Sequence, residues 1–180
     1  AAAESVRSRA SAFSAALEAS LDKFDRFSSS PTYLNRLANL AAVALDVERE
    51  AGFLALAREK SGDPFFTHRH ADSLLGQGRW QDAESLFGSL DLNRDVYGNL
   101  KLAVFHVRRS DLAAASVRVA KALEIDPLDF GALLFNGGLH LLAGRYYEAI
   151  RSLRIASEER PTSSAVYTNM AVAYARLGLR

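Results

Sequence analysis

The first apolar residues of the chain recur at steps of three or four. This spacing places them in one stripe along an amphipathic helix, whose members are Val6, Ala10, Phe13, Leu17, Leu21 and Phe24. A run of serines and Pro31 interrupts the pattern, with Ser30 suited to cap a helix that has proline in its first position. We therefore predict an N-terminal amphipathic helix within residues 1–30, whose stripe must be buried somewhere, and a new helix from Pro31.

The next stretch, from Pro31 to Lys60, is either one long helix or two helices packed antiparallel, because Gly52 is its only glycine. Asp46 is suited to cap a second helix. Acidic residues follow it in the turn where the helix dipole favours negative charge. We predict two helices.

Beyond residue 61 a short block recurs, in the forms Gly78–Ala83, Ser110–Ala115 and Gly144–Ala149. The alanines that close these blocks recur at nearly equal intervals. Gly178 opens a fourth block, and its distance from Gly144 equals the distance between Ala115 and Ala149. A small residue precedes each block by seven places, where two helices can approach closely: Ala71, Ala103, Gly137 and Ala171. Pro127 and Pro161 end the following helices at equivalent places. Such regular spacing predicts an internal helical repeat.

This register resembles that of the tetratricopeptide repeat, a helix–turn–helix unit of about 34 residues. The resemblance covers residues 64–180, divided into 64–95, 96–129, 130–163 and a half unit 164–180, with 31–63 as a degenerate pair that lacks the turn glycine. Ser110 also replaces the turn glycine of its unit. The resemblance implies an all-α fold, a right-handed solenoid of stacked helical pairs.

The resemblance further implies that the first helix of each unit lines a concave groove. Helical phase then assigns a groove with an apolar middle, in which Gly131 and Gly138 leave room for a ligand's side chains. We expect the binding residues to be His68, Asp72, Tyr97, Leu100, Lys101, Val104, Val107, Arg108, Leu134, Gly138, Leu141, Val172 and Arg176. Phe65, Leu75, Leu142 and Thr168 share this phase.

An apolar groove of this kind requires a cover. Three covers are possible: a partner's amphipathic helix or peptide, the chain's own N-terminal helix, or a second copy of the chain. The opposing interpretation is that some of these residues belong to the core between repeats and need no cover. Arg69, Lys101, Arg108 and Arg176 lie near the same surface, which favours a peptide with acidic residues flanking apolar anchors. The clamp with which some family members hold chaperone C-termini is absent, because His68, Asp72, Leu100 and Val104 stand at its places.

The composition removes several classes of function. The 180 residues include 22 Lys and Arg against 21 Asp and Glu, so the net charge of +1 gives no overall attraction to nucleic acid. The absence of cysteine excludes disulfide scaffolds, thiolate nucleophiles and zinc fingers. No apolar run is long enough for a transmembrane segment, since the nearest candidate is interrupted by Asn136 and His140.

No pattern indicates catalysis. His68 and Asp72 share a helical face, but two side chains are too few for a metal site. His140 is expected to be a hydrogen-bonded core histidine and Trp80 a core residue. There is no phosphate-binding glycine loop and no nucleophile elbow. We therefore expect no enzymatic activity, no cofactor and no metal.

The resulting hypothesis is a protein-interaction scaffold or adaptor that holds a peptide or helix in its groove. The alternatives are a secretion-type chaperone, a self-assembly module that forms homo-oligomers, and a regulatory domain of a larger enzyme. The chain stops halfway through a unit, so we expect a fragment of a larger protein. Arginine outnumbers lysine 18 to 4, which suggests a GC-rich bacterial source and a soluble protein of its cytoplasm or periplasm.

Overall fold

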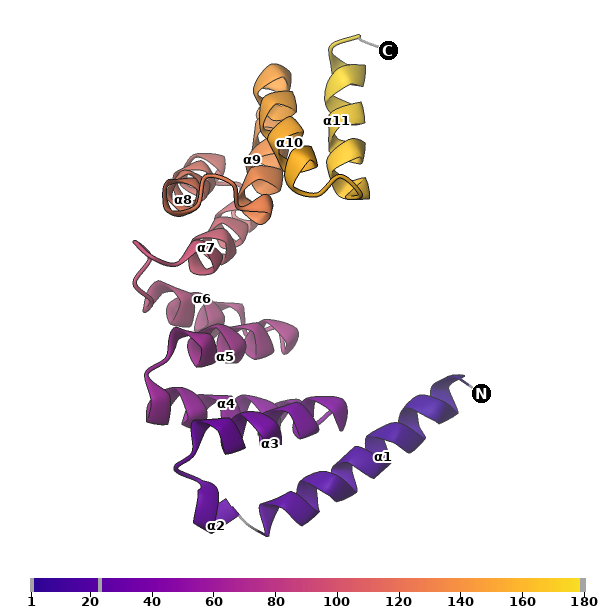
Figure 1. The fold of residues 1–180 in the computed structure, drawn as a ribbon, viewed down its shortest axis with the longest axis vertical. Helices are drawn as coiled ribbons and strands as arrows, with labels where there is room; N and C mark the ends of the chain where they lie inside the picture. The colour runs from indigo at the N-terminus through magenta and orange to yellow at the C-terminus, as the bar shows by residue number, and fades with distance from the viewer. Residues whose placement is uncertain (1, 23, 179–180) are drawn as a thin grey trace. The chain divides into compact units, whose positions relative to one another are not determined.

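The computed structural model describes the backbone of residues 2–22 and 24–178, and the side chains of residues 10–22, 24 and 27–178. These residues form α-helices joined by short turns and no strands, which confirms the all-α class (Figure 1). In chain order the helices are α1 (Ala2–Leu21), α2 (Phe24–Phe27), α3 (Pro31–Val43), α4 (Val47–Ser61), α5 (Pro64–Gly76), α6 (Trp80–Gly88), α7 (Val96–Arg108), α8 (Leu112–Ile125), α9 (Phe130–Leu142), α10 (Tyr146–Glu159) and α11 (Ser164–Arg176).

The chain divides into two compact units, one ending at Phe87 and the other beginning at Gly88. In the first unit α3 packs against α1 and α4, and α4 packs against α5. In the second unit the packed pairs include α7 with α8, α9 with α10, and α10 with α11. Within the described residues, no helix is both long enough and apolar enough to cross a membrane.

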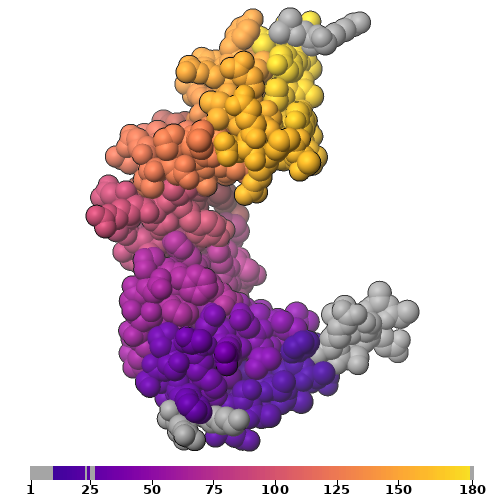
Figure 2. Space-filling model, in the orientation of Figure 1, coloured from indigo at the N-terminus to yellow at the C-terminus, as the bar shows by residue number. Residues whose placement is uncertain are grey.

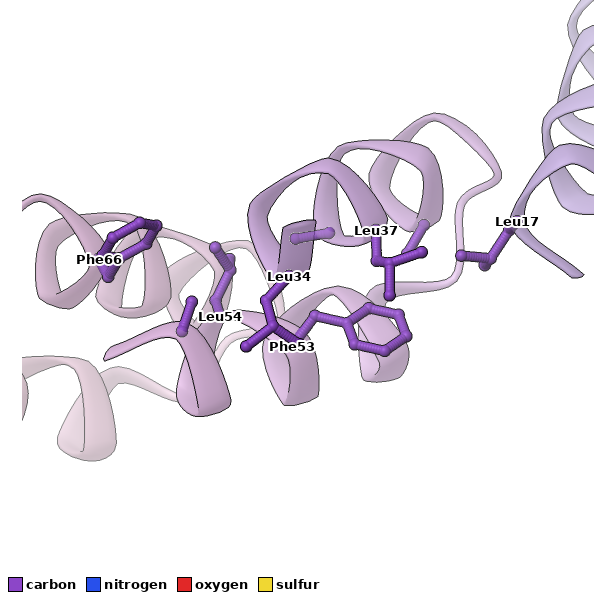
Figure 3. Close-up of a cluster of buried hydrophobic side chains, with 9 residues drawn as sticks. Leu17, Leu34, Leu37, Phe53, Leu54 and Phe66 are labelled. Atoms are coloured by element: carbon purple, nitrogen blue, oxygen red, sulfur yellow. The ribbon is translucent and has the colours of Figure 1, made fainter. Parts of the chain in front are cut away.

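The N-terminal stripe is buried only toward its C-terminal end. Leu17 is fully buried in the core that α3, α4 and Phe66 complete (Figure 3). Phe13, by contrast, is 38% exposed. Val6 lies outside the described side chains. The prediction of one helix for this region is wrong in one respect. Helix α1 ends at Leu21, and a separate short helix begins at Phe24. The end of α1 is thus part of the first unit's core.

Two predicted helix starts are confirmed. The Ser30 hydroxyl accepts a hydrogen bond from the Tyr33 amide at 3.4 Å, with Pro31 beginning α3. The Asp46 carboxylate accepts one from the Arg49 amide at 3.1 Å, so residues 31–60 do form two helices. Both caps satisfy amides that have no partner within their helix.

Four turns between paired helices share one backbone geometry. Leu45, Gly78, Ser110 and Gly144 all adopt left-handed conformations, with φ between 61° and 75°. In each turn the next amide donates to a carbonyl five residues earlier, at 2.8–2.9 Å, from Asp46, Arg79, Asp111 and Arg145. The α3–α4 turn is therefore equivalent to the glycine turns, although leucine disfavours this conformation.

Small residues do bring paired helices together. Ala71 and Ala103 are fully buried, and Gly137 lies so close to α10 that a Cβ atom there would be 2.6 Å from Leu153 Cγ. Ala171 is exposed, because among the described residues no helix packs on that face of α11. α11 is instead held from its other side by α10, whose orange surface is continuous with the yellow surface of α11 in Figure 2.

Candidate interaction groove

A cavity of about 670 Å³ lies in the second unit between α9 and α11, beside the start of α10. We call it the inner groove. It is lined by Phe135, Gly138, Leu141, Leu142, Gly144, Tyr146, Asn169, Val172 and Arg176. Six of these residues form three pairs separated by one repeat length, namely Phe135 with Asn169, Gly138 with Val172, and Leu142 with Arg176. The inner groove is therefore formed by the same face of two successive first helices.

Gly138 explains why this face is hollow. A Cβ atom at this position would meet nothing within 4 Å, so the missing side chain leaves open space above the backbone of α9. The apolar walls remain accessible, with Leu142 64% exposed and Val172 44% exposed. A surface of this kind is stabilised when an apolar side chain covers it.

Four of the expected binding residues line the inner groove: Gly138, Leu141, Val172 and Arg176. Phe135 and Asn169 were missed, although both occupy the sixth position of their helices. Phe135 and Asn169 each lie three residues before a predicted groove residue, Gly138 and Val172, and on the same helical face, so the spacing rule itself could have found them.

On α7 the expected residues differ in their surroundings. Tyr97 and Val104 are about two-fifths exposed, and the Lys101 ammonium lies 4.9 Å from the centre of the Tyr97 ring. Leu100 and Val107 instead pack against a buried cluster, as the inter-repeat alternative predicts. Leu134 of α9 packs in the same way. Arg108 is exposed at the end of α7.

Gly131 does not leave room for a ligand. A Cβ atom there would lie 3.2 Å from an Asp129 carboxylate oxygen and 3.3 Å from Leu100 Cδ1. The glycine instead permits close approach of α9 to α7. Only Gly138 of the two expected glycines faces open space.

His68 and Asp72 belong to α5 of the first unit, where both side chains are half-buried. The His68 ring lies 6.2 Å from the ring of Phe87, measured between centroids. Among the described residues, no group of three or more histidine or acidic side chains is placed to hold a metal ion.

Two core predictions need correction. Trp80 is only half-buried. The Nδ1 atom of His140 is buried but has no hydrogen-bond partner. The prediction of a hydrogen-bonded core histidine is therefore wrong for this atom. Burial of the ring, and secondarily the charge of Arg145, lower the pKa of His140, because both disfavour the imidazolium form.

The groove face is cationic as well as apolar. Arg108 and Arg176 occupy predicted inward positions of α7 and α11, Lys101 lies near them, and no predicted inward position of α7, α9 or α11 is aspartate or glutamate. Within the described part of the chain, Arg176 is the one charged side chain that lines the inner groove, so an acidic group on a ligand there would meet positive charge.

Similar solved structures identify the fold. MamA matches with a TM-score of 0.67 at 15% identity, over 83% of this chain and 84% of that one. YrrB, described as a TPR protein with an unusual peptide-binding site, matches with a TM-score of 0.63 at 18% identity, over 91% and 86%. The C-terminal part of a TPR repeat-containing protein from Cytophaga hutchinsonii matches with a TM-score of 0.73 at 15% identity, over 92% and 67%.

The chain has the tetratricopeptide repeat fold. The sequence itself matches no protein-family model and no curated protein. The tetratricopeptide fold accounts for the pairing of groove residues at a separation of one repeat, because equivalent positions of successive repeats share one face. At 15–18% sequence identity, the similarity to these structures concerns the fold alone. The residues of the inner groove itself indicate what kind of ligand it suits.

Proposed function

We propose that this chain is a protein-interaction scaffold that holds a peptide segment in the inner groove. The occupant has a large apolar side chain that enters the space above Gly138 and an acidic residue beside Arg176. The protein acts by placing its partner, and no bond chemistry is assigned to it. The observation that supports this proposal is the cavity itself, which combines accessible apolar walls with one cationic side chain, Arg176.

Two considerations favour a peptide over a compact protein surface. A cavity of about 670 Å³ lies in the size range of sites that enclose small ligands, and a single side chain with its neighbours fits that range. YrrB, which shares the fold, is described as having a peptide-binding site.

Selection of random peptides displayed on phage against the chain tests this proposal. We expect selected peptides to share one large apolar residue next to aspartate or glutamate. Binding measured by fluorescence anisotropy should weaken strongly in Gly138→Leu, which fills the cavity, and in Arg176→Glu, which reverses the rim charge. Arg154→Ala on the exposed face of α10 is the matched control and should bind normally.

Three results would contradict the proposal. Selected peptides could bind Gly138→Leu and wild type equally well, which would place their site elsewhere. Unrelated apolar peptides could bind without any need for acidic residues, which would favour the chaperone alternative. Light scattering could show concentration-dependent assembly that blocks peptide binding, which would favour the self-assembly alternative.

A further inference from the structure

The second unit has two cavities at equivalent places in successive repeats. One, the α7–α8 cavity, has a volume of about 410 Å³. The other, the α9–α10 cavity, has a volume of about 290 Å³. Seven lining positions of the first recur one repeat length later in the second: Asn93 and Pro127, Asn99 and Leu133, His106 and His140, Ala114 and Glu148, Val117 and Arg151, Arg118 and Ser152, and Lys121 and Ile155. The repeat geometry therefore produces both hollows.

The chemistry of the two cavities differs. The α7–α8 cavity has two cations on its wall, Arg118 and Lys121, with His106 opposite on α7 and no acidic side chain among its lining residues. In the α9–α10 cavity Arg151 is accompanied by Glu148. Cations without lining acids create a positive potential in a partly enclosed space, which favours an anion.

The two cations can act on one ligand. Arg118 and Lys121 are three residues apart on α8, so their side chains emerge from one helical face. Lys121 lies 3.0 Å from Glu124, but this pair is exposed and therefore weak. Arg118 is half-buried in the cavity wall, where a charge-assisted hydrogen bond is stronger than at the surface.

Asn99 makes this cavity specific to its repeat. It is fully buried where the next repeat has Leu133. Its amide nitrogen donates to the Leu92 carbonyl at 2.6 Å and to the Asp95 carbonyl at 2.9 Å, which holds the loop that carries the lining residue Leu92. Its side-chain oxygen has no partner. Burying an amide where the next repeat has leucine costs folding free energy, because the amide gives up its contacts with water. The two hydrogen bonds from Asn99 to the loop offset part of that cost.

We infer that the α7–α8 cavity binds an oxyanion carried on an apolar body, either a carboxylate or a phosphate ester. The oxyanion lies against Arg118, with Lys121 adding positive charge at the opening. The apolar part covers Val117, which is 61% exposed, and Leu92. This site is separate from the inner groove, since no lining residue is common to the two.

Titrations of the ¹⁵N-labelled chain followed by NMR test the inference. The probes are N-acetyl-leucine and phenyl phosphate, with neutral N-acetyl-leucinamide, acetate and inorganic phosphate as controls. We expect saturable shifts at Asn99, His106 and Arg118 with at least one of the two oxyanion probes, whose relative affinity then distinguishes carboxylate from phosphate. The controls should give no saturable shift at these residues.

Substitutions localise the site. Arg118→Gln should weaken binding at least about tenfold, as expected for loss of a charge-assisted hydrogen bond. Arg118→Lys should restore part of the affinity. Arg151→Gln, in the equivalent cavity of the next repeat, should bind as wild type does. Each variant's own spectrum reports whether it is folded.

The inference is overturned by any of four results. Neither oxyanion probe gives a saturable shift. The neutral amide shifts the same residues as strongly as N-acetyl-leucine. Acetate or inorganic phosphate alone binds equally well, which would mean an adventitious ion only. Arg151→Gln reduces binding as much as Arg118→Gln does.

Discussion

The neighbouring glycines of α9 should respond oppositely to alanine. Gly137 faces α10, where an added Cβ atom would lie 2.6 Å from Leu153 Cγ and 2.7 Å from Leu153 Cδ2. Leu153 is fully buried, so the added methyl group would have to displace core atoms. Gly138 faces open space, with nothing within 4 Å of an added Cβ atom. The two substitutions therefore change helix propensity equally and differ only in packing.

The expected magnitudes follow from these contacts. Alanine is favoured over glycine inside a helix by about 1 kcal/mol, so Gly138→Ala should raise the free energy of unfolding by up to that amount. Overpacking a core costs about 1–3 kcal/mol, and a Cβ at 2.6 Å from a branched carbon favours the upper part of that range. After the same propensity gain, Gly137→Ala should be destabilising by about 1–2 kcal/mol. The two variants should thus differ by about 2–3 kcal/mol.

Urea unfolding followed by circular dichroism measures this difference, and hydrogen exchange of α9 and α10 assigns it to the second unit. The Leu153→Ala background provides a further check, because it removes the atoms with which the new Cβ collides. In that background Gly137→Ala should be neutral or stabilising. If Gly137→Ala is as stable as Gly138→Ala in the natural background, the packing explanation is wrong.

Three further predictions concern the turns, the histidine and the N-terminal helix. Ser110→Gly and Leu45→Gly should each raise the free energy of unfolding by about 1 kcal/mol, because glycine adopts the left-handed conformation without strain. The urea midpoint should rise accordingly, and an unchanged midpoint would mean that the turns are unstrained. The lowered pKa of His140 means that the unfolded chain takes up a proton first, so stability should fall as the pH drops through the unfolded value of 6.5. In urea unfolding at a series of pH values His140→Gln should reduce this fall, and an unchanged pH dependence would contradict it. Leu17→Ala should lower the thermal midpoint by the equivalent of about 2–5 kcal/mol, whereas Phe13→Ala should have little effect, and equal effects would contradict the partial burial of the stripe.

Much of the fold could be predicted because helix boundaries carry local signals. Proline and aspartate mark the starts of helices, and glycine marks the turns, since each residue type favours a particular backbone conformation. The turn at Leu45 carries no such signal. Its left-handed backbone results from the packing of α3 on α4, which outweighs leucine's own preference.

The groove could be predicted only in part. Helical phase places Gly138, Val172 and Arg176 on one face, and all three line the inner groove. Phase does not reveal which residues of that face are covered by a neighbouring helix. Leu100 and Leu134 share the phase, yet they pack against buried clusters.

The sequence by itself determined the all-α class, the register of the repeat and which residues share a helical face, because these depend on local conformational preference and on the periodicity of a helix. Only the tertiary structure decided which inward positions are open. Adjacent glycines are alike in sequence, but Gly137 meets Leu153 and Gly138 meets open space. Asn99 and Leu133 likewise occupy one register, but only Asn99 hydrogen-bonds the loop of the α7–α8 cavity. Contacts between helices depend on side chains far apart in the chain, which no local pattern specifies.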